Sequence, residues 1–224
     1  MGKLILLRHG ESTWNHLNVF TGWVDIPLSR RGMEESTLAG KQIADLPIDL
    51  IFTSSLIRAQ TTVTIAMLEH SSQKSPRFMH PSDPSFHGWD AIHSNIEEQT
   101  IPVYIAWQLN ERMYGELQGK NKQEMREKFG SEQVEKWRRS FDAAPPQGES
   151  LKQTAERALP YFKERILPLL FAGKNVLVAA HGNSLRAVVM FLDNLSSQEI
   201  VHKEIATGKP IIYTFTNSSW AQNG

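Results

Sequence analysis

The sequence predicts an α/β fold in which helices flank a mainly parallel central sheet. Apolar runs typical of buried strands alternate with helical segments early in the chain, in the order strand, helix, strand, helix. The length of 224 residues fits one large domain, since α/β domains reach roughly 200–250 residues before they split. With 40% hydrophobic and 21% charged residues, the chain has enough apolar material for a sizeable core. We therefore expect residues 1–224 to form a single domain.

The composition excludes several classes of protein. The chain has no cysteine, which rules out a disulfide framework, a thiolate zinc site and a cysteine nucleophile. Its 24 basic and 24 acidic residues give a formal net charge of zero, which argues against a general nucleic-acid or membrane binder. The apolar run at residues 4–7 is too short for a signal peptide, and no stretch has the roughly 18 apolar residues of a membrane helix. We expect a soluble, cytoplasmic protein with no nucleic-acid or membrane partner.

The first elements follow from local patterns. The apolar run at residues 3–7 predicts a buried strand, and the aperiodic stretch 8–27 predicts a loop. Ser29 can cap a helix that continues to about residue 44. A second buried strand over 49–53 and a second helix over 56–68 complete the alternation.

The segment at residues 70–101 differs from the rest, because it is rich in histidine and proline and has little apolar periodicity. It predicts an inserted surface loop or flap. Five of its side chains have a spacing that could suit a metal on one helix face: His80, Asp83, His87, Asp90 and His93. Prolines at 81 and 84 oppose a regular helix there, so a plain surface flap is the favoured interpretation and a metal site the alternative.

The remaining elements are predicted from helix-capping residues, from helix-breaking prolines and glycines, and from apolar runs. Ser150 and Gln153 form a capping box at the start of a long helix that ends near residue 170, with kinks expected at Pro160 and Pro168. The other predicted elements are a strand at 103–107, a helix from the Asn121 cap to 129, a helix at 131–141, a strand at 175–180, a helix at 184–192 and a final strand at 211–215.

A strand followed by His-Gly occurs twice, at His9-Gly10 and at His181-Gly182. Ligands of an open parallel sheet bind beyond the carboxyl ends of its strands, so neighbouring strands would bring both histidines to one crevice. Glycine after each histidine permits a sharp turn and a close backbone approach. Either pattern alone is weak, since strand-end histidines are common.

Basic and polar residues near the same edge favour a phosphoryl site. Arg8 precedes the first histidine and Arg58 follows the second strand, and guanidinium groups can bind phosphate oxygens in pairs. Ser12, Asn15 and Thr21 could add neutral donors. Neutral imidazole is a competent nucleophile, and nearby arginines disfavour its protonation.

Six motifs together resemble the cofactor-dependent phosphoglycerate mutases of the histidine phosphatase superfamily. They are RHGESTWN at 8–15, FTGW at 20–23, LNERMYG at 109–115, WRR at 137–139, GESL at 148–151 and AHGNSLR at 180–186. The similarity covers about residues 1–69 and 102–217, in order. It implies a phosphoglycerate mutase-like three-layer sandwich.

The resemblance also implies residue roles. His9 would be the nucleophile that forms a phosphohistidine, with Arg8, Arg58 and His181 completing the phosphoryl pocket and Glu111 acting as general acid and base. The implied substrate-binding residues are Ser12, Asn15, Thr21, Gly22, Arg112, Tyr114, Lys122, Arg138, Arg139, Gly182 and Asn183.

The implied reaction is the interconversion of 2- and 3-phosphoglycerate in glycolysis and gluconeogenesis, primed by 2,3-bisphosphoglycerate and without a metal. Six cations (Arg8, Arg58, Arg112, Lys122, Arg138 and Arg139) against Glu11 and Glu111 would make the cleft electropositive. The resemblance further suggests a homodimer or homotetramer.

Two other functions remain open at this point. A phosphatase of the same superfamily would use His9 and Glu111 but transfer the phosphoryl group to water. A catalytically silent phosphoprotein-binding domain would lack one of those two residues, and both are present. Because many relatives have a C-terminal tail over the active site and this chain ends soon after its last predicted strand, we expect the flap at 70–101 to replace that tail as a lid.

Overall fold

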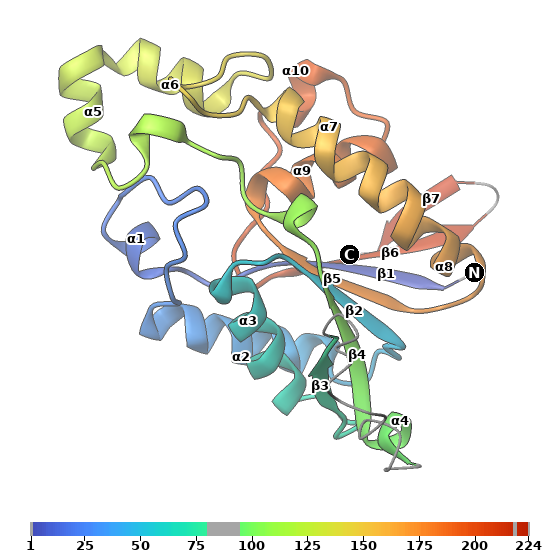
Figure 1. The fold of residues 1–224 in the computed structure, drawn as a ribbon. Coiled ribbons are helices and arrows are strands. Elements are labelled where there is room, and N and C mark those ends of the chain that lie inside the picture. Colours follow the sequence, from blue (N-terminus) through green and yellow to red (C-terminus); the bar gives the residue numbers. More distant parts are fainter. Residues whose placement is uncertain (1, 80–94, 217–218, 224) are drawn as a thin grey trace, which may run out of the picture.

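The computed structural model describes residues 2–79, 95–216 and 219–223. Within them, seven strands form one sheet in the order β3-β4-β2-β5-β1-β6-β7 (Figure 1). The five strands from β3 to β1 are parallel, and β6 and β7 are antiparallel, which confirms a mainly parallel sheet. The strands are β1 (Lys3–Arg8), β2 (Leu50–Thr53), β3 (Ser75–Phe78), β4 (Thr100–Ile105), β5 (Val176–Ala180), β6 (Pro210–Thr216) and β7 (Ser219–Asn223).

Helices cover both faces of the sheet, as the three-layer expectation requires (Figure 1). Alternate side chains of β1 point to opposite faces: Ile5 and Leu7 pack toward α2 (Arg30–Ile43) and α3 (Ile57–Leu68). Leu4 and Leu6 belong to the apolar cluster on the other face, where α7, α8 and α9 lie. Those helices span Leu151–Tyr161, Leu167–Phe171 and Gly182–Leu192.

A helical excursion stands away from the sheet and contains α5 (Lys122–Phe129) and α6 (Ser131–Arg139) (Figure 1). It has a small apolar cluster of its own, made by Phe20, Leu117, Met125 and Val134, with Tyr114 and Trp137 packed against it. Three short α-helices and two 3-10 helices complete the described fold. The α-helices are α1 (Thr13–His16), α4 (Ile96–Gln99) and α10 (Ser197–Ile200), and the 3-10 helices span Trp107–Leu109 and Gly115–Leu117.

The predicted helix caps are confirmed. The Ser29 side chain accepts a hydrogen bond from the Gly32 N–H at the start of α2, and Asn121 caps α5. Ser150 and Gln153 form the capping box of α7. The long helix predicted to residue 170 is interrupted by a wider π-helical turn, Phe162–Ile166, which only Leu167 separates from Pro168, whereas Pro160 lies inside α7, one residue before its end. A proline has no N–H to continue the regular ladder, which accounts for the interruption.

Three predictions about connections need correction. Residues 8–27 contain the short helix α1, and the predicted flap contains strand β3, helix α4 and the start of β4. Strand β7 follows the strand that we expected to be last. Both missed strands are short sheet edges with polar residues, so they lack the continuous apolar run of a buried strand. The predicted helix at 131–141 ends at Arg139.

The candidate metal ligands at 80, 83, 87, 90 and 93 lie outside the described residues. In the described part of the chain, no helix is both long enough and apolar enough to span a bilayer.

Candidate active site

Two histidines meet at the carboxyl edge of the sheet. His9 follows β1 and His181 follows β5, and these strands are parallel neighbours. The His9 N–H continues the pairing by donating to the Ala180 carbonyl at 3.0 Å. The centroids of the two imidazole rings are 4.8 Å apart. The predicted convergence of the two strand ends is therefore present.

His9 is buried, and one of its ring nitrogens is available as a nucleophile. Its Nδ1 lies 2.6 Å from the Gly10 carbonyl oxygen. A carbonyl can only accept, so Nδ1 bears the proton and Nε2 keeps its lone pair. Burial, and then the charges of Arg58 and Arg8, lower the pKa of His9 well below its ordinary value, although the Gly10 carbonyl opposes this. The ring is therefore neutral near pH 7.

A close backbone crossing requires glycine after His9. A Cβ on Gly10 would lie 2.1 Å from the carbonyl oxygen of Gly32, in the first turn of α2. We expected this glycine to let the backbone approach a ligand, and its neighbour is instead the backbone of α2. At Gly182 a Cβ would lie 3.5 Å from the Arg8 guanidinium, so that glycine leaves room for a site residue.

Two guanidinium groups near the histidines are anchored to backbone carbonyls. Arg58 donates from Nη2 to the Gly22 carbonyl at 2.8 Å and from Nη1 to the Val24 carbonyl at 3.0 Å. Arg8 donates from Nη1 to the Ile205 carbonyl at 2.7 Å. Burial lowers the pKa of Arg58 to about 10, so the group remains charged near neutral pH. The two cations are suited to stabilising phosphoryl oxygens.

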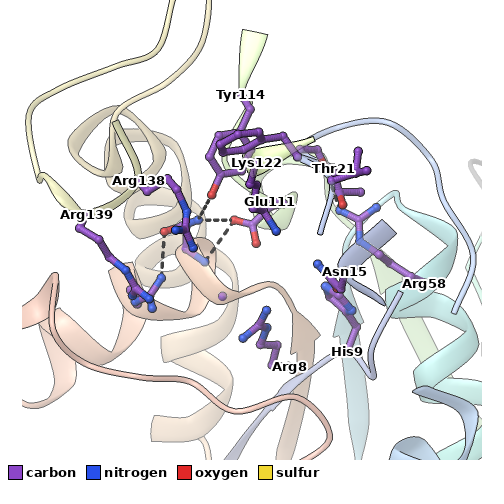
Figure 2. A pocket seen from close by; sticks show the side chains of 16 residues that line it. Arg8, His9, Asn15, Thr21, Arg58, Glu111, Tyr114, Lys122, Arg138 and Arg139 are labelled. Carbon is purple, nitrogen blue, oxygen red and sulfur yellow. Dashed lines mark hydrogen bonds between the residues drawn. The ribbon is translucent and has the colours of Figure 1, made fainter. Parts of the chain in front are cut away.

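Glu111 is the single acidic residue among the described residues that line the pocket. Its Oε1 accepts hydrogen bonds from the Arg112 N–H at 2.7 Å and from the Asn183 side-chain amide at 2.8 Å. Burial raises the pKa of Glu111, but the Arg112 N–H, Arg8, Asn183 and Arg58 together lower it below its ordinary value. The carboxylate is thus ionised, and an arriving anion would raise its pKa toward proton uptake. Figure 2 shows Glu111 on one side of the pocket, with Arg8 and His9 on the other.

A second group of residues, the distal cluster, lines the same pocket and consists of Tyr114, Lys122, Arg138 and Arg139 (Figure 2). Lys122 begins α5, and the two arginines end α6. Both arginines share one exposed carboxylate, since Arg138 Nη1 lies 3.2 Å and Arg139 Nε 3.6 Å from the Glu135 oxygens. The pair could have been an ordinary solvated helix face, and it instead lines the pocket.

Lys122 in the distal cluster has a lowered pKa. Burial, and then the nearby charges of Arg138, Arg8 and Arg126, lower the pKa of Lys122 to about 8. Such crowding of cations indicates a site that is stabilised when an anion enters.

Most of the predicted site residues line this one pocket, which has about 720 Å³ of space including its mouth. No described residue of the predicted flap lines it, and the lid hypothesis otherwise concerns residues 80–94, outside the described part. The predicted residues that line the pocket are Arg8, His9, Asn15, Thr21, Gly22, Arg58, Glu111, Tyr114, Lys122, Arg138, Arg139, Gly182 and Asn183.

Two predicted ligand-binding residues do not line the pocket. Ser12 is fully buried, and its hydroxyl accepts the Asn15 N–H at 3.1 Å as the cap of α1, so its role as a donor to a ligand stays a prediction. Arg112 is also fully buried and lies behind the distal cluster. Its Nη2 donates to the Tyr114 hydroxyl at 3.2 Å and to the Arg138 carbonyl at 3.0 Å. Arg112 therefore organises residues of the distal cluster from behind.

His181 lies behind the lining as well, fully buried against His9. Its Nε2 is 2.7 Å from the Ser54 hydroxyl, which already accepts the Leu56 N–H at 3.2 Å. Burial, and then the charges of Arg58, His9, Arg8 and Arg157, lower the pKa of His181 well below its ordinary value. When Ser54 donates its hydroxyl proton to Nε2, the neutral ring carries its own proton on Nδ1, which can then donate to a ligand. That Nδ1 is buried and has no partner within the described part of the chain.

Sequence reasoning missed residues that the fold places at the site. Arg186 lines the pocket, donates from Nη1 to the Asn183 side-chain oxygen at 3.1 Å, and has a pKa lowered by burial to about 10. It follows Asn183 by three residues on α9, a spacing that places both on one helix face. Ser54 could have been found from its position directly after β2, at the same sheet edge as the histidines.

One residue that we assigned to the cleft, Glu11, does not line the pocket. Its carboxylate instead accepts a hydrogen bond from the Ser29 hydroxyl at 2.8 Å.

The unpaired polar atoms at the site can all act as hydrogen-bond donors. Buried atoms without a partner in the described chain include Arg8 Nε, His181 Nδ1 and the Thr21 hydroxyl oxygen, together with Arg112 Nε and Nη1. Unpaired donors beside a cation-lined pocket fit a small ligand with several anionic oxygens. Among residues 2–79, 95–216 and 219–223, no three His, Cys, Asp or Glu side chains are grouped as a metal site.

Known proteins resemble this chain over nearly its whole length. The family model of the histidine phosphatase superfamily (branch 1) matches residues 4–79 and 90–223. A 2,3-bisphosphoglycerate-dependent phosphoglycerate mutase of Protochlamydia amoebophila is 57% identical over 98% of this chain and 98% of its own length. The Chlamydia muridarum protein of the same name is 54% identical, over 100% of this chain and 98% of its own length.

A solved structure resembles the fold at much lower sequence identity. The structure of a putative alpha-ribazole-5'-P phosphatase from Escherichia coli aligns with a TM-score of 0.75 and 21% identity, over 99% of this chain and 94% of its own. At that identity the likeness concerns the fold alone.

Proposed function

This chain belongs to the histidine phosphatase superfamily, and we infer that it is a 2,3-bisphosphoglycerate-dependent phosphoglycerate mutase. It interconverts 2-phosphoglycerate and 3-phosphoglycerate, a step of glycolysis and gluconeogenesis. The high identity to mutases over the full length favours this function over the phosphatase alternative.

One observation supports the inference most strongly: two groups of cations flank one pocket, with a neutral histidine between a pair of arginines. A phosphatase that releases phosphate from simple monoesters needs positive charge at the transferring phosphoryl group only. A mutase must also hold the carboxylate and the second phosphate of its substrate. The distal cluster supplies that second set of donors.

In the first half of the proposed reaction, His9 Nε2 attacks the phosphorus of a bound phosphate ester. The bond from phosphorus to the ester oxygen breaks as the nitrogen–phosphorus bond forms, and protonated Glu111 gives its proton to the departing oxygen. Arg8, Arg58 and the His181 Nδ1–H stabilise the charge on the transferring group. The binding of a polyanion supplies the rise in the pKa of Glu111 that this proton transfer requires.

In the second half, the acceptor hydroxyl attacks the phosphorus of phosphorylated His9. Glu111, now a carboxylate, takes the hydroxyl proton, and the nitrogen–phosphorus bond breaks to restore neutral His9. The distal cluster holds the acceptor by its other anionic group, so that the hydroxyl reaches the phosphohistidine before water does. Transfer to the free hydroxyl of a monophosphoglycerate forms 2,3-bisphosphoglycerate. After this intermediate reorients in the pocket, His9 takes back its other phosphate, which releases the isomeric phosphoglycerate and restores the phosphohistidine.

The proposed priming molecule fits the donors of the pocket. A bisphosphate would place one phosphate near Arg8 and Arg58 and the other near the distal cluster, and it supplies the phosphoryl group that starts the cycle. We propose that no metal takes part, because fixed guanidinium groups provide the positive charge. Treatment with a chelator should therefore leave turnover unchanged. A cytoplasmic location and a homodimer or homotetramer stay predictions, the latter open to sedimentation analysis.

The test is an incubation with 3-phosphoglycerate, with and without a catalytic amount of 2,3-bisphosphoglycerate, followed by phosphorus NMR. We expect 2-phosphoglycerate to form rapidly in the primed sample and slowly without priming, with little free phosphate in either. Strong release of free phosphate without interconversion of the isomers would instead identify a phosphatase.

A further inference from the structure

One side chain of α7, Arg157, forms several hydrogen bonds to the loop that contains Glu111. This guanidinium donates from Nη1 to the carbonyl of Gln108 at 2.8 Å and to that of Asn110 at 3.1 Å. From Nη2 it donates to the carbonyl of Glu111 itself at 2.8 Å. Three carbonyls within four consecutive residues thus share one donor group.

Glu149 holds Arg157 in the orientation that these bonds need. The two side chains form a bidentate pair, with Nε to Oε1 and Nη2 to Oε2 both at 2.9 Å. The side chain of Arg157 is 9% exposed and that of Glu149 20% exposed, so water screens the pair only partly. These hydrogen bonds require a planar guanidinium group, because an ammonium group cannot donate along the same set of directions.

The Arg157–Glu149 pair is also bound to the chain that follows Glu111, through Glu149. Glu149 Oε2 accepts the Met113 N–H at 3.0 Å, and the Glu149 N–H donates to the Met113 carbonyl at 2.8 Å. The residues before and after Glu111 are therefore both tied to the Arg157–Glu149 pair.

Trp23 completes the support from a separate loop. Its indole N–H donates to the Glu111 carbonyl, and the Arg157 guanidinium lies over its ring at 5.4 Å from the ring centroid. The Glu111 carbonyl therefore accepts two hydrogen bonds while its carboxylate faces the pocket. Such backbone support is what proton transfer demands, because a catalytic carboxyl must be within roughly 2.6–3.2 Å of the oxygen it serves.

We propose that Arg157, held by Glu149, is a positioning residue that sets the location of the Glu111 carboxylate for proton transfer. The proposal rests on the role given to Glu111 in the proposed function. Arg157 touches no reacting atom, and its effect passes through the Glu111 main chain. A shift of about 1 Å in a catalytic group can lower the rate by roughly 10²-fold, even when substrate binding is intact.

The test compares two phosphoryl donors in single-turnover phosphorylation of His9. The alkoxide that leaves 2,3-bisphosphoglycerate needs a proton from Glu111, whereas the nitrophenolate that leaves p-nitrophenyl phosphate is stable without one. We expect Arg157→Met to slow phosphorylation by the bisphosphate by about 10–100-fold and phosphorylation by the aryl phosphate by less than about threefold. Arg157→Lys and Glu149→Gln should show the same selective loss to a smaller extent.

Glu111→Gln separates failure of this proposal from failure of the proposed function. If Glu111→Gln slows both donors equally, the acid role of Glu111 is wrong. If Glu111→Gln is selective for the bisphosphate while Arg157→Lys and Glu149→Gln slow both donors equally or neither, the positioning role is wrong. Combining Arg157→Lys with Glu111→Gln should add little to Glu111→Gln alone, because both act on one proton transfer.

Two controls guard against a purely structural effect. Arg165→Met removes an exposed arginine in the segment that follows α7, and it should leave both rates unchanged. Arg157→Met removes the side-chain donor of the Gln108 and Asn110 carbonyls and one of the two donors of the Glu111 carbonyl. If this variant fails to fold, the two conservative variants decide the outcome. A general loosening of the site would lower the rate with both donors, which is the result that contradicts the proposal.

Discussion

The candidate active site contains two regions that are built in different ways. The proximal group, made of Arg8, His9, Arg58, Glu111 and His181, lies at or beside the carboxyl edge of the sheet and is mostly buried. The distal cluster (Tyr114, Lys122, Arg138 and Arg139) lies on or beside the helical excursion, and the Arg139 side chain is 46% exposed.

The difference in support suggests a division of labour. The main apolar core holds the strand ends of the proximal group, whereas a small cluster around Val134 holds α5 and α6. In the proposed mutase, the sheet edge performs phosphoryl transfer and the excursion selects the acceptor. The excursion could therefore change substrate preference without disturbing the phosphohistidine chemistry.

The largest effect should come from the proximal group. His9→Ala removes the only atom proposed to accept the phosphoryl group, so mutase turnover and any phosphate release should fall together to background. The measurement is isomer formation and phosphate release from the same sample. Persistence of either activity would show that another group is the nucleophile.

A smaller loss is expected from Ser54→Ala. Without the Ser54 hydroxyl, His181 loses the partner of its Nε2 and can present the wrong nitrogen to the phosphoryl group. We expect kcat to fall by about 10–100-fold with KM little changed, as for a displaced transition-state donor.

Thr53→Val is the matched control for Ser54→Ala. It removes a neighbouring buried hydroxyl, which donates to the Ala179 carbonyl at 3.0 Å, at no cost to His181. This variant should lose stability but keep kcat. Equal losses of kcat in the two variants would mean that Ser54 has only a structural role.

The distal cluster should dominate the alkaline side of the pH profile. Lys122 is charged below its lowered pKa of about 8 and loses that charge as the pH rises above it. If only the charged form binds substrate, kcat/KM should fall by roughly tenfold between pH 7 and pH 9. Lys122→Arg keeps the charge and should move this fall to higher pH. A profile that is the same in both proteins would assign the fall to another group.

The smallest effect on catalysis should come from the support of the distal cluster. Val134 is fully buried in the small apolar cluster, and Val134→Ala should destabilise the protein by about 1–3 kcal/mol. We expect KM to rise by roughly two- to fivefold with kcat nearly constant, because the loss is local to the excursion. Denaturation curves and initial rates measure the two quantities, and a fall in kcat alone would contradict the division.

The same two regions differ in how well sequence predicts them. Strand ends could be located because β1 and β5 are continuous apolar runs, and each is followed at once by His-Gly. Their adjacency in the sheet then brings His9 and His181 together, as expected for parallel strands. The distal cluster could be assigned only through the family resemblance, since helical spacing alone does not separate Arg138 and Arg139 from a solvated face.

Other features could not be predicted because they depend on tertiary packing. The edge strands β3 and β7 are polar and short, so no apolar period marks them. Arg157 contacts carbonyls 46–49 residues away in the sequence, and only the packing of α7 beside the Glu111 loop creates those bonds. Arg112 and Ser12 lie in matching motifs, yet burial places the side chains behind the pocket lining.

The division of labour is tested most directly by the fate of one phosphoryl group on phosphorylated His9. Phosphoenzyme of the wild type and of the double variant Arg138→Ala, Arg139→Ala would be mixed with 3-phosphoglycerate, and transfer to the acceptor compared with transfer to water. Phosphoenzyme would be formed with p-nitrophenyl phosphate, which has no second anionic group for the distal cluster to hold. We expect the variant to form phosphohistidine from this donor at a normal rate, but to shift its transfer strongly toward water. A variant that forms phosphohistidine poorly, or that divides the group between acceptor and water as the wild type does, would contradict the account.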